Sequence, residues 1–528
     1  MGFMKNIWKR SVPTKNSLTG TINEKEPLQT NLQENIQKIK KDLGNSDDIV
    51  IREVWIGKTR DVKAAIIYTD GLADNTTINE FIMESLMQDA KKSEIDKALS
   101  SSQSLVHVLK DVALAVGDVQ DITDFQTLYA SLLSGDAVIL LDGQKQGFSA
   151  GARGWKDMGV TEATNQTTVR GPRESFSESL RTNTSLIRRK IKDPNLWLET
   201  RKIGRVTKTN VSIAYVKGIV NEKVVEEVRI RLDRIDIDGI LESGYIEELI
   251  QDETYTPFPT IYNTERPDVV AAELLEGKVA ILIDGTPNAL IVPAPLIVFL
   301  HGAEDYYQRA DFATLLRILR YISGFIALLG PSLYIAITTF HQEMLPTQLL
   351  ISLAAQREGV PFPAFIEALM MEVTFEILRE AGLRMPRAIG QAVSIVGTLV
   401  IGQAAVEAGI VSAAMVIVVS ITAISNFTFP AYNMSIAVRM LRFPIMGLAA
   451  SFGLFGIIVG IIALVLHLCS LRSFGIPYMT PFAPFIPADQ KDTIFRLPQW
   501  ALVSRPRLIN QKNVVRKQSS PPKPKPRQ

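Results

Sequence analysis

The stretch 445–471, IMGLAASFGLFGIIVGIIALVLHLCSL, contains no Asp, Glu, Lys or Arg. A helix needs about 20 mostly apolar residues to cross a bilayer, so this stretch predicts one transmembrane helix. The stretch 322–342 lacks the same charges, and 388–426 carries only Glu407. Because 388–426 is too long for one helix, we divide it at Glu407 into a hairpin of two helices. The predicted membrane domain, 310–472, therefore has four spans, near 322–342, 388–406, 410–430 and 445–470.

A further segment of this half, 361–381, is amphipathic rather than apolar. Successive residues of a helix turn by about 100°, so Glu372, Glu376 and Arg379 share one face. Two interpretations stay open. The helix either lies on the membrane surface with solvated carboxylates, or spans the membrane in several copies that ring a water-filled pore. Rings of carboxylates favour cations, so in the second case Glu372, Glu376 and Arg379 are candidate pore-lining residues.

Three glycines of the last predicted span, Gly453, Gly456 and Gly460, are candidate helix-packing residues. Gly456 and Gly460 form a GxxxG pattern, which lets the backbone of a second helix approach closely. Glycine is common in membrane helices in any case, so the pattern predicts a helix contact rather than a specific dimer.

The polar first part of the chain contains an internal repeat. IGKTRDVKAAIIYTDGL (56–72) aligns without gaps to IGRVTKTNVSIAYVKGI (203–219), and GDAVILLDG (135–143) matches GKVAILIDG (277–285). Each half has the pattern of two strands, helices, a buried strand ending in Asp-Gly, and a return strand. We predict two similar lobes, 31–165 and 166–300. The fold class is thus an internally duplicated, two-lobed cytoplasmic α+β domain followed by an all-α polytopic membrane domain.

Composition and motifs exclude several classes of function. The chain has 57 Lys+Arg against 55 Asp+Glu, a net charge of +2 that gives no field for binding nucleic acid. One Cys and four scattered His do not supply a metal cluster. Asp142 and Asp284 lack a second ligand at a suitable spacing and are interpreted as turn residues. Without a Ser/His/Asp, P-loop or HExxH pattern, we predict no catalytic, cofactor-binding or metal residues, no cofactor and no enzymatic activity.

The charges also predict a topology. Residues 1–30 are polar and lack the apolar segment of a signal peptide, so we expect a disordered cytoplasmic arm. Lys and Arg recur near the end of the segment 473–528, and this basic tail should also be cytoplasmic by the positive-inside rule. Four spans agree with two cytoplasmic ends. Arg439 and Arg442 argue against this topology, because it places them outside.

Several longer motifs resemble one family. They are FHQEMLPTQLL (340–350), REGVPFPAFIEALMMEVTFEILREAGLRMP (357–386), IGQAVSIVGTLVIGQAAVEAG (389–409), RSFGIPYMTPFAPF (472–485), RTNTSLIRRKI (181–191) and RPDVVAAELLEGKVAILIDGTPNALIVP (266–293). In this order and spacing they resemble the A-subunit family of spore germination receptors, the GerA family, over roughly residues 30–500. Asn288 and Ser394 depart from the residue types common at those positions.

The resemblance implies an endospore-forming bacterium and a multi-pass protein of the spore inner membrane. It implies two partners, a permease-like B subunit that binds the nutrient and a lipoprotein C subunit, in a receptor that triggers germination. We expect this subunit to form a homo-oligomer in the lipid bilayer that conducts ions. The alternative is a stand-alone secondary transporter of a small solute. Transporters usually repeat their hydrophobic halves, whereas the visible repeat lies in the soluble part. Neighbouring genes for the two partners would favour the receptor.

Overall fold

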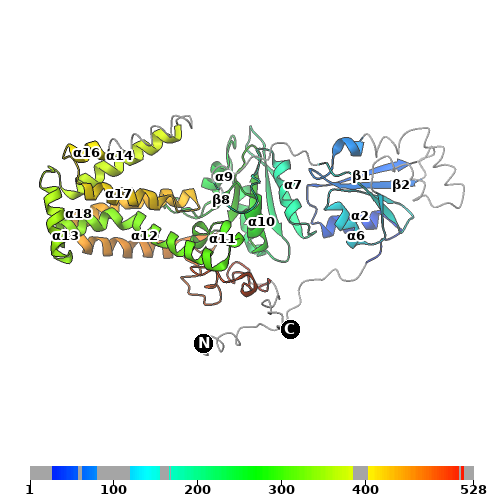
Figure 1. The fold of residues 1–528 in the computed structure, drawn as a ribbon. Helices are drawn as coiled ribbons and strands as arrows, with labels where there is room; N and C mark the ends of the chain where they lie inside the picture. The colour runs from blue at the N-terminus through cyan, green and yellow to red at the C-terminus, as the bar shows by residue number, and fades with distance from the viewer. Residues whose placement is uncertain are drawn as a thin grey trace, which may run out of the picture.

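The computed structural model describes residues 26–56, 62–79, 119–154, 166, 168–384, 402–510 and 513–516. Figure 1 shows three parts in a row: a first sheet with its helices, a second sheet with its helices in the middle, and a group of long helices at the other end. We call them lobe 1 (26–154), lobe 2 (168–300) and the helical region (304–470). Most of the predicted arm 1–30 lies outside the described residues.

Lobe 1 is an antiparallel sheet with helices packed on one face. Its elements are α2 (Leu32–Asp42), β1 (Ile49–Ile56), β2 (Val62–Thr69), β3 (Val119–Ile122), α6 (Phe125–Leu132), β4 (Ala137–Leu141) and β5 (Gly147–Ala150). The strand order is β1-β2-β4-β5-β3. The central strand β4, AVILL, is buried along its whole length. Its residues Val138 and Leu140 pack with α2 and α6 on one face, and the others pack with Ala73 and Ile78 on the opposite face. An apolar run without alternation fits a strand that is covered on both faces.

Lobe 2 repeats the arrangement of the described elements of lobe 1, and two helices are described between its second and third strands in chain order. Its elements are α7 (Leu180–Lys190), β6 (Leu196–Ile203), β7 (Thr209–Val216), α8 (Glu222–Asp233), α9 (Ser243–Ile250), β8 (Tyr262–Thr264), α10 (Pro267–Leu275), β9 (Val279–Ile283), β10 (Ala289–Val292) and the short 3-10 helix η4 (Leu296–Leu300). The strand order β6-β7-β9-β10-β8 equals that of lobe 1. The predicted pair of similar α+β lobes is confirmed.

The equivalence of the lobes extends to single contacts. Ile66 pairs with Ile139 in lobe 1, and Ile213 pairs with Ile281 in lobe 2. The carboxylate of Asp142 accepts a hydrogen bond from the backbone N–H of Leu32, at the start of α2, at 3.0 Å. That of Asp284 accepts one from Leu180, at the start of α7, at 2.9 Å. Each Asp-Gly turn therefore also satisfies a free N–H at a helix start.

The two lobes are joined by a buried ion pair. The guanidinium of Arg188, on α7, donates to both carboxylate oxygens of Asp48, just before β1, at 2.7 and 3.0 Å. Both side chains are almost fully enclosed. The Ser46 hydroxyl accepts a hydrogen bond from the Leu198 N–H at 3.1 Å beside this pair. The lobes therefore share a polar contact shielded from water.

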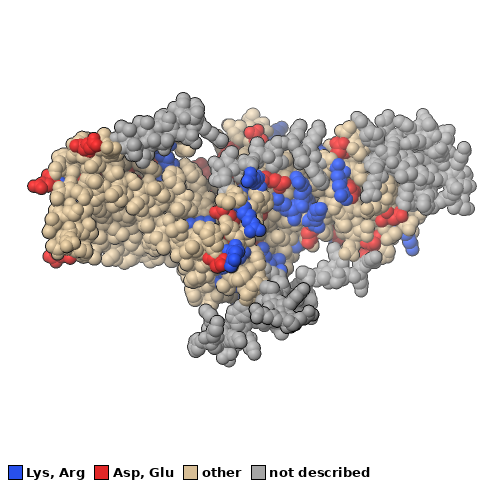
Figure 2. Space-filling view, in the orientation of Figure 1, with Lys and Arg blue, Asp and Glu red and all other residues tan. Residues whose placement is uncertain are grey.

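The helical region contains α11 (Glu304–Tyr307), α12 (Ala310–Phe340), η5 (Gln342–Met344), α13 (Thr347–Arg357), α14 (Ala364–Arg384), α16 (Gly402–Glu407), α17 (Ala413–Asn426) and α18 (Tyr432–Ser470). Two of the described helices, α12 and α18, are long and apolar enough to cross a membrane. The helix α12 contains the predicted span 322–342 up to Phe340, and α18 contains the predicted span 445–470. Figure 2 shows few charged side chains on this face of the helical region, whereas Lys and Arg gather over lobe 2.

The other two predicted spans are not matched by a described helix of spanning length. The span 388–406 lies mostly outside the described residues. The span 410–430 contains α17, an apolar helix of 14 residues, which is shorter than the about 20 residues that cross a bilayer. The arrangement of four spans stays a prediction.

The segment after α18 returns to lobe 2. It contains β11 (Arg472–Ser473), β12 (Ile476–Pro477) and the short η7 (Gln499–Ala501). The Tyr478 hydroxyl donates to the Pro259 carbonyl at 2.8 Å, and the Ser473 hydroxyl donates to the Thr260 carbonyl at 2.6 Å. Buried residues at both ends of α18, Met434 and Leu468, belong to the same hydrophobic cluster as one face of the lobe 2 sheet. Lobe 2 and α18 therefore share a core.

One carboxyl of lobe 2 makes its stability depend on pH. Burial and the neighbouring charge of Glu242 raise the pKa of Glu247, on α9, from 4.5 to about 7, and a hydrogen bond with Asn263 opposes the rise. Between those values the unfolded chain loses the proton before the folded chain does. The contribution of Glu247 is therefore most favourable below pH 4.5 and is lost as the pH rises through about 7.

We expect Glu247→Gln, which cannot ionise, to stabilise the protein at pH 8 by roughly 2 kcal/mol and to change little at pH 4. The measurement is the thermal unfolding midpoint of both forms at the two pH values. Glu248→Gln, at the exposed neighbouring position, is the control and should have no such effect. An equal change at both pH values would contradict the assignment.

Candidate functional site

The acidic face predicted on α14 packs against α18. The Arg442 guanidinium donates to the Glu372 carboxylate at 2.5 Å and to the carbonyl of Ala327, on α12, at 2.7 Å. The Glu372 and Arg442 side chains are both 1% exposed. One buried ion pair therefore ties three helices together inside the helical region.

A second group of charges lies one helical turn further along α14. Glu376 receives hydrogen bonds from Arg439, on α18, at 2.9 Å and from Arg379 at 2.7 Å. Arg379 also donates to the Tyr432 hydroxyl at 3.1 Å. The Glu376 and Arg379 side chains are 25% and 20% exposed, so this group is more open than the Glu372–Arg442 pair. The three predicted site residues thus lie together.

A third carboxylate of α14, Glu367, is fully buried and joins two other helices. It accepts a hydrogen bond from the N–H of Ser412, the residue that caps α17, at 3.0 Å. It also lies 3.4 Å from the guanidinium of Arg357, on α13. Ionised groups inside a membrane domain are costly unless paired, and they commonly mark functional positions. We take these three charged contacts of α14 as the candidate site.

The sequence pattern located the acids of this site and missed their partners. Arg439 and Arg442 are the only Lys or Arg residues of α18, and from the sequence they indicated only a conflict with the predicted topology. Arg442 stands 70 residues from Glu372 in the chain. The detectable signal was two cations one turn apart in an apolar helix, matched to two acids one turn apart in an amphipathic one.

The glycines of α18 accommodate a break in that helix. Gly453 has φ +58° and ψ −140° inside the helix, a conformation that other residues rarely adopt. A Cβ there would lie 2.7 Å from Cε1 of His341, at the end of α12. At Gly456 it would lie 2.2 Å from the Leu448 carbonyl oxygen, and at Gly460 3.1 Å from the Leu448 side chain. Gly453 thus permits close approach to a helix of the same chain. Packing against another chain stays a prediction.

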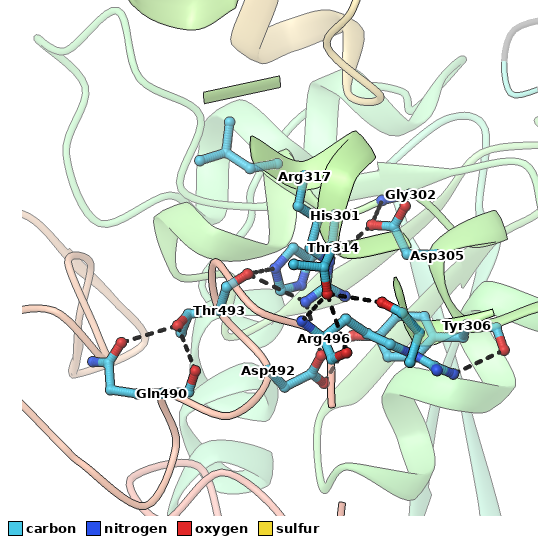
Figure 3. Close-up of polar contacts among 12 residues, drawn as sticks. His301, Gly302, Asp305, Tyr306, Thr314, Arg317, Gln490, Asp492, Thr493 and Arg496 are labelled. Atoms are coloured by element: carbon cyan, nitrogen blue, oxygen red, sulfur yellow. Dashed lines mark hydrogen bonds and ion pairs between the residues drawn. The ribbon is translucent and has the colours of Figure 1, made fainter. Parts of the chain in front are cut away.

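A second polar cluster connects the start of α12 to the segment after α18 (Figure 3). The buried Arg317 guanidinium donates to Asp305 at 3.1 Å and to Asp492 at 2.9 Å. Arg320, one turn on, donates to Asp305 at 2.6 Å. Tyr306 donates to the other oxygen of Asp492 at 3.0 Å. We call these residues the junction cluster, because they join the two ends of the helical region beside lobe 2.

His301 lies beside the junction cluster and is neutral. Burial and the charge of Arg317 hold the pKa of His301 well below its ordinary value. Its Nε2 lies 3.1 Å from the Thr493 carbonyl oxygen, which can only accept, so Nε2 carries the proton. Burial also raises the pKa of Asp492, and Arg317 opposes that rise. Among the described residues, no group of three or more His, Cys, Asp or Glu is placed to hold a metal ion.

A duplicated α+β domain joined to apolar helices that carry paired charges defines a class of membrane protein with a large domain outside its apolar helices. Residues 37–508 match the family model described as Bacillus/Clostridium GerA spore germination protein. The chain belongs to the GerA spore germination protein family. The predicted resemblance is confirmed.

Relatives of known name share most of the chain. Spore germination protein KA of Bacillus subtilis (strain 168) is 51% identical over 489 residues, which is 93% of this chain and 88% of the relative. Uncharacterized membrane protein YfkQ of the same strain is 44% identical over 92% of each chain. Spore germination protein GerLA of Bacillus cereus is 39% identical over 92% of this chain and 97% of the relative.

A solved structure also matches. It is the N-terminal domain of the A subunit of the Bacillus megaterium spore germinant receptor GerK3, with 45% identity, 51% of this chain and 98% of that chain covered, and a TM-score of 0.42.

Proposed function

We propose that this chain is the A subunit of a nutrient receptor in the spore inner membrane that triggers germination. The observation that carries the proposal is the family match over residues 37–508, which includes both lobes and the helical region. Relatives named as spore germination proteins cover the same length. The role is non-enzymatic and needs no cofactor. Its partners would be a permease-like B subunit and a lipoprotein C subunit.

We propose further that copies of this chain assemble into a ligand-gated ion channel in which α14 lies beside the ion path. Three observations support this role: Glu367, Glu372 and Glu376 follow one another along α14, each has a cationic partner, and Glu376 and Arg379 stay partly accessible. Carboxylates gathered around a pore favour cations. In this proposal both termini are cytoplasmic, so the lobes and the segment after α18 lie on the inner side.

The test replaces Glu372 and Glu376 together by Gln in spores that contain this receptor as their only one. We expect the release of monovalent cations after a mixture of amino acids and sugars to slow at least tenfold, because the path loses its negative charge. The single variant Glu376→Gln, at the more open position, should retain normal protein levels and show the same change more weakly. Glu380→Gln, on the same helix in an exposed pair with Arg384, is the control. Normal release and cation preference at normal protein level would exclude α14 from the path.

A stand-alone transporter is the other candidate. It would work without partner subunits, whereas the receptor requires them. Adjacent genes for a permease-like protein and a lipoprotein favour the receptor, and an isolated gene favours the transporter.

A further inference from the structure

A cavity of about 460 Å³ lies between lobe 2, α11 and the segment after α18. Its walls come from α10, from residues 295–307, from residues 480–509 and from Arg516. The volume falls within the range of roughly 300–1,000 Å³ that is usual for sites of small organic ligands. Asp492 and Tyr306 of the junction cluster belong to its lining. The cavity is therefore large enough for a ligand and directly touches the contacts that hold α12.

The lining carries more negative than positive side chains. Its carboxylates are Asp268, Glu273, Glu276, Asp489 and Asp492, and its Lys and Arg residues are Lys278, Lys491 and Arg516. Two of these carboxylates, Asp268 and Asp492, pair with Arg266 and Arg317 outside the lining, and Glu273 pairs with Lys278 within it. Burial raises the pKa of Glu276, Asp489 and Asp492, with Arg516 opposing the rise at Glu276 and Arg317 opposing it at Asp492. An added cation would therefore stabilise the ionised carboxylates.

Two acceptors of the lining are left free. Asp268 is 8% exposed, and its Oδ2 accepts hydrogen bonds from Arg266 at 2.8 Å and Tyr307 at 2.5 Å. Its Oδ1 is buried and has no hydrogen-bond partner among the described residues. Because Nε2 of His301 carries the proton, its Nδ1 is an acceptor, also without a partner in the described part of the chain. A ligand that donates hydrogen bonds fits both groups.

The rest of the lining is apolar or aromatic. Val269, Ala272, Ile297 and Leu502 contribute carbon surface, and the rings of Tyr262, Tyr306 and Tyr307 also line the cavity. Tyrosine faces attract organic cations, and apolar walls favour a ligand with an apolar body. The lining thus combines acceptors, negative charge, aromatic rings and apolar surface.

We propose that this cavity is a binding site for a small organic ammonium ion with an apolar body. The ammonium group lies toward the free Oδ1 of Asp268, and the apolar body lies against the carbon surface of the lining. Asp492 and Tyr306 line the same cavity. Asp492 accepts a hydrogen bond from Arg317 of α12, and the Arg317 guanidinium lies over the Tyr306 ring, so the ligand occupies a position next to the attachment of the first long apolar helix.

The internal repeat indicates that the proposed ammonium site belongs to lobe 2 and has no equivalent on the matching helix of lobe 1. The segment GKVAILIDG aligns to GDAVILLDG, and the same alignment places Glu273 and Glu276 opposite Ser131 and Ser134 of lobe 1. The helix α10 therefore carries acids that its counterpart α6 lacks. Ala272 aligns to Ala130, and both are exposed positions on these equivalent helices. This pair supplies a matched control.

The experiment is a calorimetric titration of the full chain, purified in detergent, with three probes of similar shape, and protein-free micelles serve as the blank. The probes are 2-phenylethylammonium, neutral 2-phenylethanol and anionic 3-phenylpropanoate. We expect saturable binding of the ammonium ion with one site per chain, and at least tenfold weaker binding of the other two. Equal binding of all three probes, or no saturable binding of the ammonium ion, would overturn the proposal.

Two variants locate the site. Ala272→Phe places a ring in the cavity and should weaken ammonium binding at least tenfold, while Ala130→Phe on α6 should bind like the parent. Asp489→Asn removes one charge and keeps an oxygen that can accept the Arg507 N–H, so it should weaken binding of the ammonium ion and leave that of phenylethanol unchanged. Unaltered binding by Ala272→Phe would place the ligand elsewhere. The readout is binding by the purified chain, so it is independent of the proposed receptor function.

Discussion

Replacing Arg442 by Met should destabilise the helical region by about 3–5 kcal/mol, because the Glu372 carboxylate would stay buried without its partner. Met has a similar length and apolar surface, so the lost charge rather than a cavity determines the result. The measurement is thermal unfolding of the detergent-purified chain, together with the amount of protein recovered from membranes. We expect a large fall in both.

Two further variants distinguish the loss of the buried ion pair from a general effect of replacing Arg by Met. Arg384→Met breaks the pair with Glu380 at the end of the same helix, where both side chains are more than half exposed, and should cost about 1 kcal/mol or less. The double variant Glu372→Met/Arg442→Met removes both charges and should recover most of the lost stability, since an apolar pair can replace a buried ion pair. If Arg442→Met unfolds at the temperature of the parent, the pair does not hold these helices together.

Replacing Arg188 by Met should have an effect of similar size at the contact between the lobes. Asp48 would stay enclosed beside lobe 2 without a cation, which costs about 3–5 kcal/mol. Hydrogen exchange on the full chain should show faster exchange in the segment 46–48 and at the start of β6. The thermal midpoint of the soluble lobes should fall in parallel.

The chain offers a close control for this variant. Arg181, also on α7, forms an ion pair with Asp70 of lobe 1 at 2.6 Å, but these side chains are 47% and 36% exposed. Arg181→Met should therefore cost about 1 kcal/mol or less, although it too breaks a contact between the lobes. Equal losses for Arg188→Met and Arg181→Met would show that burial does not set the strength of this contact.

The sequence predicted the elements whose determinants are local. Alternating and continuous apolar runs predicted four strands in each lobe, and the repeated Asp-Gly motif predicted the same succession of elements in both. The edge strands β3 and β8 and the order of strands within the sheets were not predicted. The helical period placed Glu372, Glu376 and Arg379 on one face of α14. In these cases the pattern and the structure depend on residues within one or two turns or strands of each other.

The missed features depend on residues far apart in the chain. The carboxylate of Asp284 caps the start of α7 from 104 residues away, so the Asp-Gly motif revealed the turn and not the cap. Asp492 meets Arg317 across 175 residues, and nothing near either residue indicates the other. The cavity has the same origin, since its walls come from lobe 2 and from a segment that the sequence described only as a basic tail.

The shared core of lobe 2 and α18, with the junction cluster beside it, sets how motion can pass along the molecule. Both ends of the helical region are anchored on lobe 2, while lobe 1 stands at the far end of the row (Figure 1). Lobe 2 is therefore the support on which the helical region is fixed, and lobe 1 projects from its opposite side. A displacement of lobe 1 would act on lobe 2 through the Asp48–Arg188 contact, and lobe 2 shares its core with α18.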